Sequence, residues 1–201
     1  EGGEGGEWLA LFCEKGGVEN VLEKLYSWEE RRDCVAGYQV VTHLMRVLVV
    51  LFTKKGGGIA PHMETLVHRL MDLVLVAGNS SSGAGRGSGA GGAVAGSLTG
   101  VGCCAMLLLT TCAREECLPA VLRFPLLDAW LWGTLTCASG GVRHAVLEGV
   151  LQWCGDGAGD AAVFLRLLLP LFARSHLRPG TCGELASGVA ALVAQAARAG
   201  E

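Results

Sequence analysis

The amino-acid sequence predicts an all-α fold in which about ten helices, joined by short turns, stack as hairpins. Hydrophobic residues make up 51% of the 201 residues, and most of them are Leu, Val and Ala, whereas isoleucine occurs only at Ile59. Leu and Ala are strong helix formers. Apolar residues recur at intervals of three and four, and no stretch alternates apolar and polar residues over five positions without fitting a helix better.

The first helical half covers residues 1–77. Gly16-Gly17 and the triplet at 56–58 are predicted to end helices, because glycine adopts the left-handed conformation that helix C-termini need. Pro61 suits the first turn of a helix, where its missing N–H has no partner to lose. The predicted helices are Glu7–Lys15, Val18–Tyr26, Asp33–Lys55 and one that begins at Pro61.

A Gly/Ser/Ala-rich segment, residues 78–102, interrupts this pattern, with ten glycines among its 25 residues. Such a composition buries too little apolar surface to offset the entropy of ordering the chain. We therefore expect a disordered insertion between two helices. The segment lacks the GxxxxGK[ST] pattern of a phosphate-binding loop.

The second helical half covers residues 103–201 and continues the same stack, so no domain boundary is expected. Pro170 is predicted to kink its helix, and Thr181 with Glu184 has the spacing of a capping box. The predicted helices are Leu98–Cys112, Glu115–Arg123, Leu126–Ala138, Val142–Cys154, Asp160–Arg174 and Cys182–Arg198.

Two segments of the chain echo each other. Residues 16–28 read GGVENVLEKLYSW and residues 140–153 read GGVRHAVLEGVLQW, so that Gly-Gly-Val, Val-Leu, Glu and Trp align with a one-residue gap. Repeated helix–Gly-Gly–helix units are typical of armadillo and HEAT solenoids, whose repeats bury their apolar faces against one another. The alternative is an irregular helical bundle in which the two glycine turns coincide by chance.

Charge and hydropathy limit the partners. The formal net charge of −3 gives no reason to expect nucleic acid. The most apolar stretches are interrupted by charge or are too short for a membrane span, so no membrane association is expected.

Nine cysteines, scattered through apolar helical stretches, indicate reduced core thiols and hence a cytoplasmic or nuclear protein. The chain opens with EGGEGGE and ends in a helical pattern, and we expect it to be a piece of a longer protein.

The sequence predicts no catalytic, metal-binding or cofactor-binding residues. No cysteine lies in a recognisable nucleophile motif. The nearest approach to a zinc site, Cys103-Cys104 with Cys112 and Cys117, lacks a CxxC pair. Acidic pairs such as Glu115-Glu116 lie at predicted helix starts, where they favour the helix dipole.

Trp130 and Trp132 are the candidate partner-binding residues. Two positions apart on a helix, they cannot both face the core, so one is expected at the surface or at a seam between hairpins. An exposed tryptophan there would be a binding hot spot for another protein. Packing against the next repeat is the alternative, and the pattern favours it.

The C-terminal third resembles the helical, non-catalytic arm of the very large ubiquitin-specific proteases of the fat-facets type. The resemblance rests on a short leaf around Leu122–Leu127, a helix ending in Cys137, and then the segments VRHAVLEGVLQWC, FLRLLLPLF and CGEL. The earlier FCEKGGVENVLEKL is similar to the same arm. The resemblance implies a parent enzyme that removes ubiquitin with a Cys–His catalytic domain. The cysteine and histidine boxes of that domain are absent from these 201 residues.

These observations lead to one functional hypothesis and two rivals. The first is a scaffold segment that positions substrates or adaptor proteins for a deubiquitinating enzyme. The second is an armadillo/HEAT adaptor in transport or signalling, unrelated to ubiquitin. The third is a small enzyme whose active site leaves no recognisable motif.

Overall fold

The computed structural model describes residues 7–8, 11–12, 14–27, 35–53, 63–80, 90–112, 114–155, 158–173 and 179–198. Within these ranges the chain is helical and contains no strand, which confirms the predicted all-α class. The labelled helices are α2 (Gly17–Tyr26), α3 (Val35–Thr53), α4 (Met63–Ser80), α5 (Ala90–Thr111), α6 (Arg114–Leu122), α7 (Leu127–Leu135), α8 (Gly140–Cys154), α9 (Ala158–Phe172) and α10 (Pro179–Arg198).

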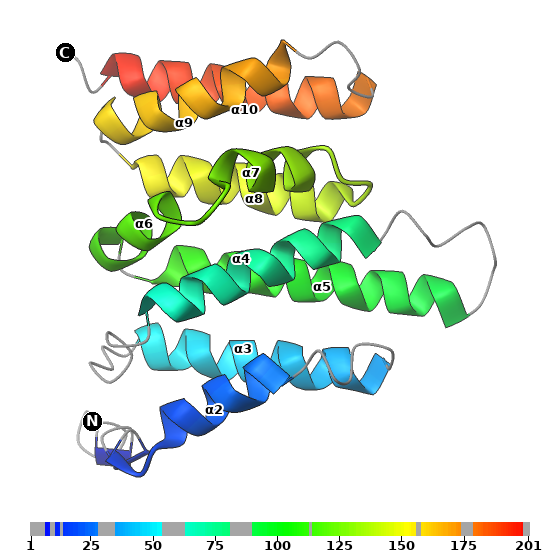
Figure 1. Ribbon diagram of the computed structural model, residues 1–201, viewed down its shortest axis with the longest axis vertical. Coiled ribbons are helices and arrows are strands. Elements are labelled where there is room, and N and C mark those ends of the chain that lie inside the picture. Colours follow the sequence, from blue (N-terminus) through cyan, green and yellow to red (C-terminus); the bar gives the residue numbers. More distant parts are fainter. Residues whose placement is uncertain are drawn as a thin grey trace.

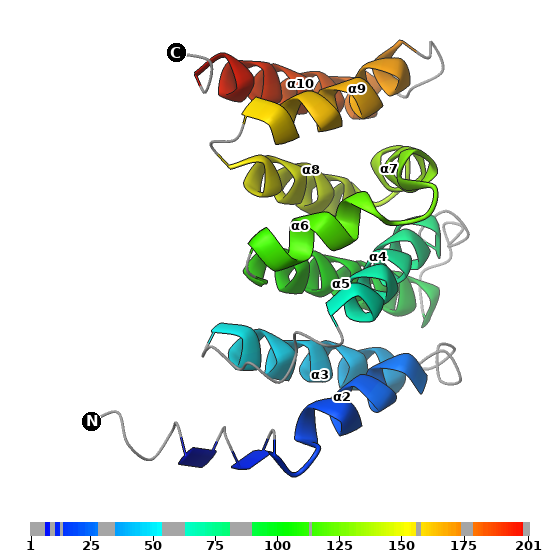
Figure 2. The ribbon, with the colours of Figure 1, turned by 60° about the vertical axis from the view of Figure 1, so that its left-hand side comes forward.

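The helices form antiparallel pairs that succeed one another along the longest axis of the molecule (Figure 1). The pairs are α2 with α3, α4 with α5, α7 with α8, and α9 with α10. The second helices of successive pairs pack in one layer, α3 on α5, α5 on α8 and α8 on α10. In a second layer α4 contacts α7 and α7 contacts α9, and the short α6 packs on α4 (Figure 2).

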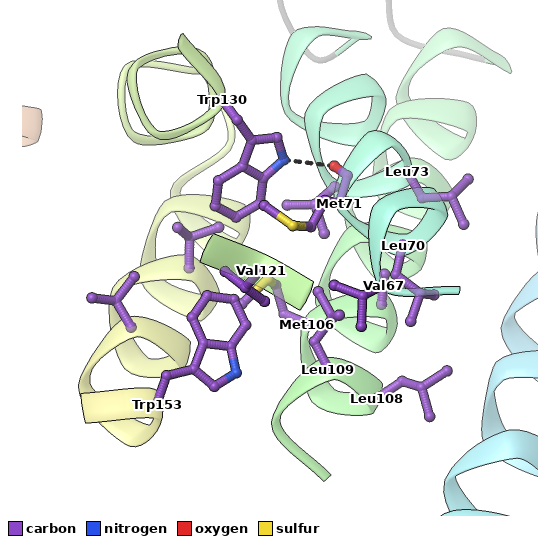
Figure 3. Packing of buried hydrophobic residues seen from close by; sticks show 14 of the residues in the cluster. Val67, Leu70, Met71, Leu73, Met106, Leu108, Leu109, Val121, Trp130 and Trp153 are labelled. Carbon is purple, nitrogen blue, oxygen red and sulfur yellow. Dashed lines mark hydrogen bonds between the residues drawn. The ribbon is translucent and has the colours of Figure 1, made fainter. Parts of the chain in front are cut away.

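One hydrophobic core runs through the whole stack, from Val18 of α2 to Leu192 of α10. Two tryptophans anchor its middle (Figure 3). The indole N–H of Trp130 donates a hydrogen bond of 2.7 Å to the carbonyl oxygen of Met71, and Trp153 stacks on Phe164 with ring centroids 6.2 Å apart. Each large side chain buried in this way contributes about 1.5–3 kcal/mol, so adjacent pairs stabilise each other.

The two echoing segments open helices at different places in their pairs, since α2 is the first helix of its pair and α8 is the second helix of its pair. Gly16, with a φ of 71°, comes directly before α2. Gly140 and Gly141 are the first two residues of α8, and Ser139 precedes them. The hydroxyl of Ser139 caps α8 by accepting a hydrogen bond from the backbone N–H of Val142. Aligned apolar positions are buried in both helices, and they are Val18 and Val142, Leu22 and Leu147, and Leu25 and Val150. The aligned letters therefore mark a similar buried face within each helix, while the two helices differ in their place in the stack.

Most predicted helices agree with the structure to within a few residues. Pro170 lies inside α9, which ends at Phe172. Of the predicted helix Glu7–Lys15 only part is described, and the residues at 7–8, 11–12 and 14 are helical. The predicted capping box of Thr181 and Glu184 is wrong, since α10 begins earlier, at Pro179, and Glu184 bonds to Arg143 instead.

The prediction of a disordered segment at 78–102 is wrong wherever the structure describes that segment. Residues 78–80 are the end of α4 and residues 90–102 belong to α5, while residues 81–89 lie outside the described residues. The physical reason is close helix packing. A Cβ added to Gly102 would lie 2.8 Å from the Cβ of Ala77 and 3.1 Å from Cγ2 of Val142, and one added to Gly78 would lie 3.0 Å from Sγ of Cys137. These glycines let three helices approach closely, so a composition typical of linkers forms part of the core.

In the described part of the chain, no helix is both long enough and apolar enough to cross a membrane.

Candidate protein-binding surface

Trp130, the first of the two candidate binding residues, lies in the core. Its side chain is 1% exposed, and besides its bond to Met71 it meets the ring of Phe124 edge-on at 6.5 Å. A partner cannot reach it without opening α7 from α4. Trp130 is therefore a structural residue, and its prediction as a binding residue is wrong.

Trp132, the second candidate, is half-buried and faces the neighbouring helical pair. It lines a hollow of about 460 Å³ between α7 and α9. The pairs α7–α8 and α9–α10 are neighbours in the stack (Figure 1), and α7 contacts α9. The residues that line the hollow are Asp128, Ala129, Trp132, Arg166, Leu167, Pro170 and Leu171. We call it the α7–α9 groove.

The groove combines an apolar interior with a charged rim. Trp132 and Leu167 are half-buried and Leu171 is buried, so they offer apolar surface without projecting into solvent. Asp128 and Arg166 are exposed, and they stand on opposite walls because one belongs to α7 and the other to α9. A site of this kind can hold an apolar side chain and orient the groups on either side of it.

Pro170 adds a polar feature to the wall formed by α9. Proline has no backbone N–H, so the carbonyl oxygen of Arg166, four residues earlier, cannot receive the usual helical hydrogen bond. Both residues line the groove.

A second hollow, of about 580 Å³, lies on the polar face of α4. Its lining residues are Glu64, Thr65, His68, Arg69 and Asp72. Two of these side chains join α4 to the α6–α7 region. Nε2 of His68 lies 3.1 Å from the carbonyl oxygen of Ala120, and Glu64 pairs with Arg123 at 3.2 Å. These contacts connect α4 to Ala120 of α6 and to Arg123, which follows α6.

No disulfide joins the described cysteines, four of which are buried. Burial raises the pKa of the Cys103 thiol, and the adjacent Cys104 raises it further. Burial likewise raises the pKa of the Cys137 thiol and outweighs the opposing influence of Arg143. A raised pKa keeps these groups protonated and poorly nucleophilic at neutral pH. Cys13 and Cys34 lie outside the described residues.

In the described ranges, no group of three His, Cys, Asp or Glu side chains is placed to hold a metal ion. Cys112 and Cys117, which the sequence brought closest to a zinc pattern, use their thiols instead as donors to the backbone carbonyls of Leu108 and Leu109, at 3.2 Å each. Both buried thiols therefore bond to carbonyl oxygens near the C-terminal end of α5.

Sequence reasoning found Trp132 but not the rest of the groove. In the sequence, Asp128 and Arg166 have the pattern of ordinary solvent-facing charges. No local sequence pattern indicates that these two residues, 38 positions apart, line the same hollow. The one usable signal was Pro170, which was recognised as a helix irregularity.

No protein-family model, curated protein or solved structure matches this chain.

Proposed function

We propose that this chain is a non-catalytic, protein-binding scaffold segment, and that the α7–α9 groove is a place where a partner protein binds. The observation that carries the proposal is the position of Trp132, half-buried in a hollow where two helical pairs meet. Tryptophan and arginine are the residues most often found at binding hot spots, which favour pockets with apolar interiors and polar rims.

The architecture supports this role. The described residues form four antiparallel pairs stacked in two layers, with the extra short α6 in the third unit, and this arrangement fits an armadillo/HEAT-like α-solenoid. In such a solenoid each repeat contacts only its neighbours, so seams between repeats recur along an extended surface. Scaffolds use such surfaces to hold other proteins.

The context of the scaffold is the second part of the proposal. The resemblance of VRHAVLEGVLQWC and FLRLLLPLF to the arm of fat-facets type ubiquitin-specific proteases favours a large deubiquitinating enzyme, for which this segment would position ubiquitinated substrates or adaptor proteins. Free, buried thiols fit a protein of the cytoplasm or nucleus. The alternative is an armadillo/HEAT adaptor in transport or signalling.

Two measurements test the proposal. The first is turnover of ubiquitin carrying a fluorogenic C-terminal group, for which we expect no rate above the blank. Nucleophilic cleavage needs an accessible thiolate with a base in hydrogen-bond reach. Turnover that a single cysteine substitution abolishes would show that the chain is an enzyme.

The second is quantitative capture from cell extract with the wild-type chain, the Trp132→Ala variant and a matched control, Leu169→Ala. Leu169 is an exposed residue of α9 that does not line the groove. We expect a set of proteins to bind the wild type and the control and to be lost from Trp132→Ala. Enrichment of ubiquitin-conjugated proteins in that set supports the deubiquitinase scaffold, and its absence supports the adaptor. Identical capture by all three chains would contradict binding at the groove.

A further inference from the structure

We propose that the α7–α9 groove recognises an extended peptide segment in which one bulky apolar residue lies between a basic and an acidic residue. This inference rests on the proposed protein-binding role and specifies the chemistry of the partner. The apolar side chain enters beside Trp132, the acidic group pairs with Arg166, and the basic group pairs with Asp128.

The size of the groove limits the partner to one large apolar side chain, which we call the anchor. Its lining residues run from Asp128 to Trp132 on α7 and from Arg166 to Leu171 on α9. At a rise of 1.5 Å per residue this is about 6–8 Å of each helix, little more than one turn. A partner helix needs a groove several turns long to seat residues at i, i+3, i+4 and i+7. A hollow of about 460 Å³ is suited instead to one large side chain such as phenylalanine or leucine.

The backbone of α9 favours an extended partner over a helical one. Pro170 has no N–H to donate to the carbonyl oxygen of Arg166, and both residues line the groove. Within a helix the backbone N–H groups are already used, except in the first turn. An extended segment keeps its N–H groups free, so it can donate to this carbonyl while its anchor fills the hollow.

The charges of the rim give the order of the flanking groups. A guanidinium and a carboxylate on opposite walls attract opposite charges, and charge-assisted hydrogen bonds to arginine are among the strongest that proteins form. In an extended peptide the residues at i−2, i and i+2 point to the same side. A basic residue two positions from the anchor and an acidic residue two positions away on its other side therefore both face the groove, as pairing with Asp128 and Arg166 requires.

The test uses fluorescein-labelled peptides with the cores Lys-Gly-Phe-Gly-Glu, Glu-Gly-Phe-Gly-Glu, Lys-Gly-Phe-Gly-Lys and Lys-Gly-Ala-Gly-Glu, with binding followed by anisotropy. We expect the wild-type chain to bind the first at least about fivefold more tightly than the others, since each change removes a contact of order 1 kcal/mol. Trp132→Ala should weaken this binding by at least about tenfold. N-methylation of the backbone at Phe and the following Gly should also weaken it.

Charge-reversal variants give the sharper result, and their exposed positions should leave the fold, monitored by circular dichroism, unchanged. Arg166→Glu should shift the preference to Lys-Gly-Phe-Gly-Lys, and Asp128→Lys to Glu-Gly-Phe-Gly-Glu. Preferences that stay the same in both variants would overturn the proposal. So would tighter binding by an alanine-based helical peptide carrying the same Lys, Phe and Glu. If no extended peptide binds while Trp132→Ala still loses captured proteins, this inference fails and the scaffold role stands; if neither effect occurs, both fail.

Discussion

Arg143 of α8 donates two hydrogen bonds to the carboxylate of Glu184 of α10. Its Nε donates to Oε2 at 2.6 Å and its Nη2 donates to Oε1 at 3.2 Å. The remaining Nη1 donates to the carbonyl oxygen of Cys137 at 2.7 Å, in the turn between α7 and α8. One guanidinium therefore ties the last helical pair to the pair before it and fixes the turn that precedes its own helix.

Arg143→Ala should lower the free energy of unfolding by about 2 kcal/mol, because it removes three charge-assisted contacts from a side chain that is only 14% exposed. Urea denaturation followed by circular dichroism measures the change. The matched control is Arg123→Ala, which breaks the pair with Glu64. Those two side chains are 61% and 56% exposed, and exposed pairs contribute at most about 1 kcal/mol. Equal losses in the two variants would contradict the role given to Arg143.

The same pair predicts a pH dependence. The hydrogen bond from Arg143 lowers the pKa of the Glu184 carboxyl below its usual value of 4.5. A lowered carboxyl pKa gives stability that is fully present above that usual value and is lost as the pH falls through the pKa of the folded state. The Glu184→Gln variant should thus be less stable than the wild type at neutral pH, and the difference should shrink below pH 4.5. Urea midpoints for both proteins over this range provide the measurement, and a gap that stays constant in acid would show that the pair does not titrate with folding.

Local patterns in the sequence were enough to predict most of the helices, because apolar residues at a spacing of three and four define a buried face wherever the helix packs. They also predicted that Trp130 and Trp132 differ in exposure. They could not predict that Arg143 meets Glu184, 41 positions away. Glu184 fits a capping box by spacing alone, and only the packing of α10 on α8 decides otherwise.

The glycine-rich segment shows why composition misled. Disorder is expected when a segment buries little apolar surface, yet glycine also allows helices to approach more closely than any side chain permits. In α5 the side-chain surface that Gly102 lacks is replaced by contact with Ala77 and Val142 from two other helices. Those contacts come from distant parts of the sequence, so no local pattern reveals them.

Reactivity of the thiols should follow their burial. Cys112, Cys117, Cys137 and Cys154 are buried, whereas Cys182 is partly exposed. We expect N-ethylmaleimide to modify the buried four at least about tenfold more slowly than Cys182 under native conditions, and all five readily in urea, because burial shields a thiol from the reagent. Peptide mapping by mass spectrometry after timed labelling gives each rate. Two or more disulfides in protein purified without reductant would overturn the assignment of reduced core thiols.

Two glycines on one helix give opposite predictions. Gly102 is buried between Ala77 and Val142, whereas a Cβ added to Gly100 meets nothing within 4 Å. Alanine stabilises a helix interior by about 1 kcal/mol relative to glycine, so Gly100→Ala should raise the free energy of unfolding by up to that amount. At Gly102 the added methyl group would lie 2.8 Å from the Cβ of Ala77, which forces the helices apart. Overpacking of this kind costs about 1–3 kcal/mol, so Gly102→Ala should be less stable than the wild type. Urea denaturation of the two variants decides the matter, and a stabilising Gly102→Ala would mean that α4, α5 and α8 do not pack as closely as the structure has them.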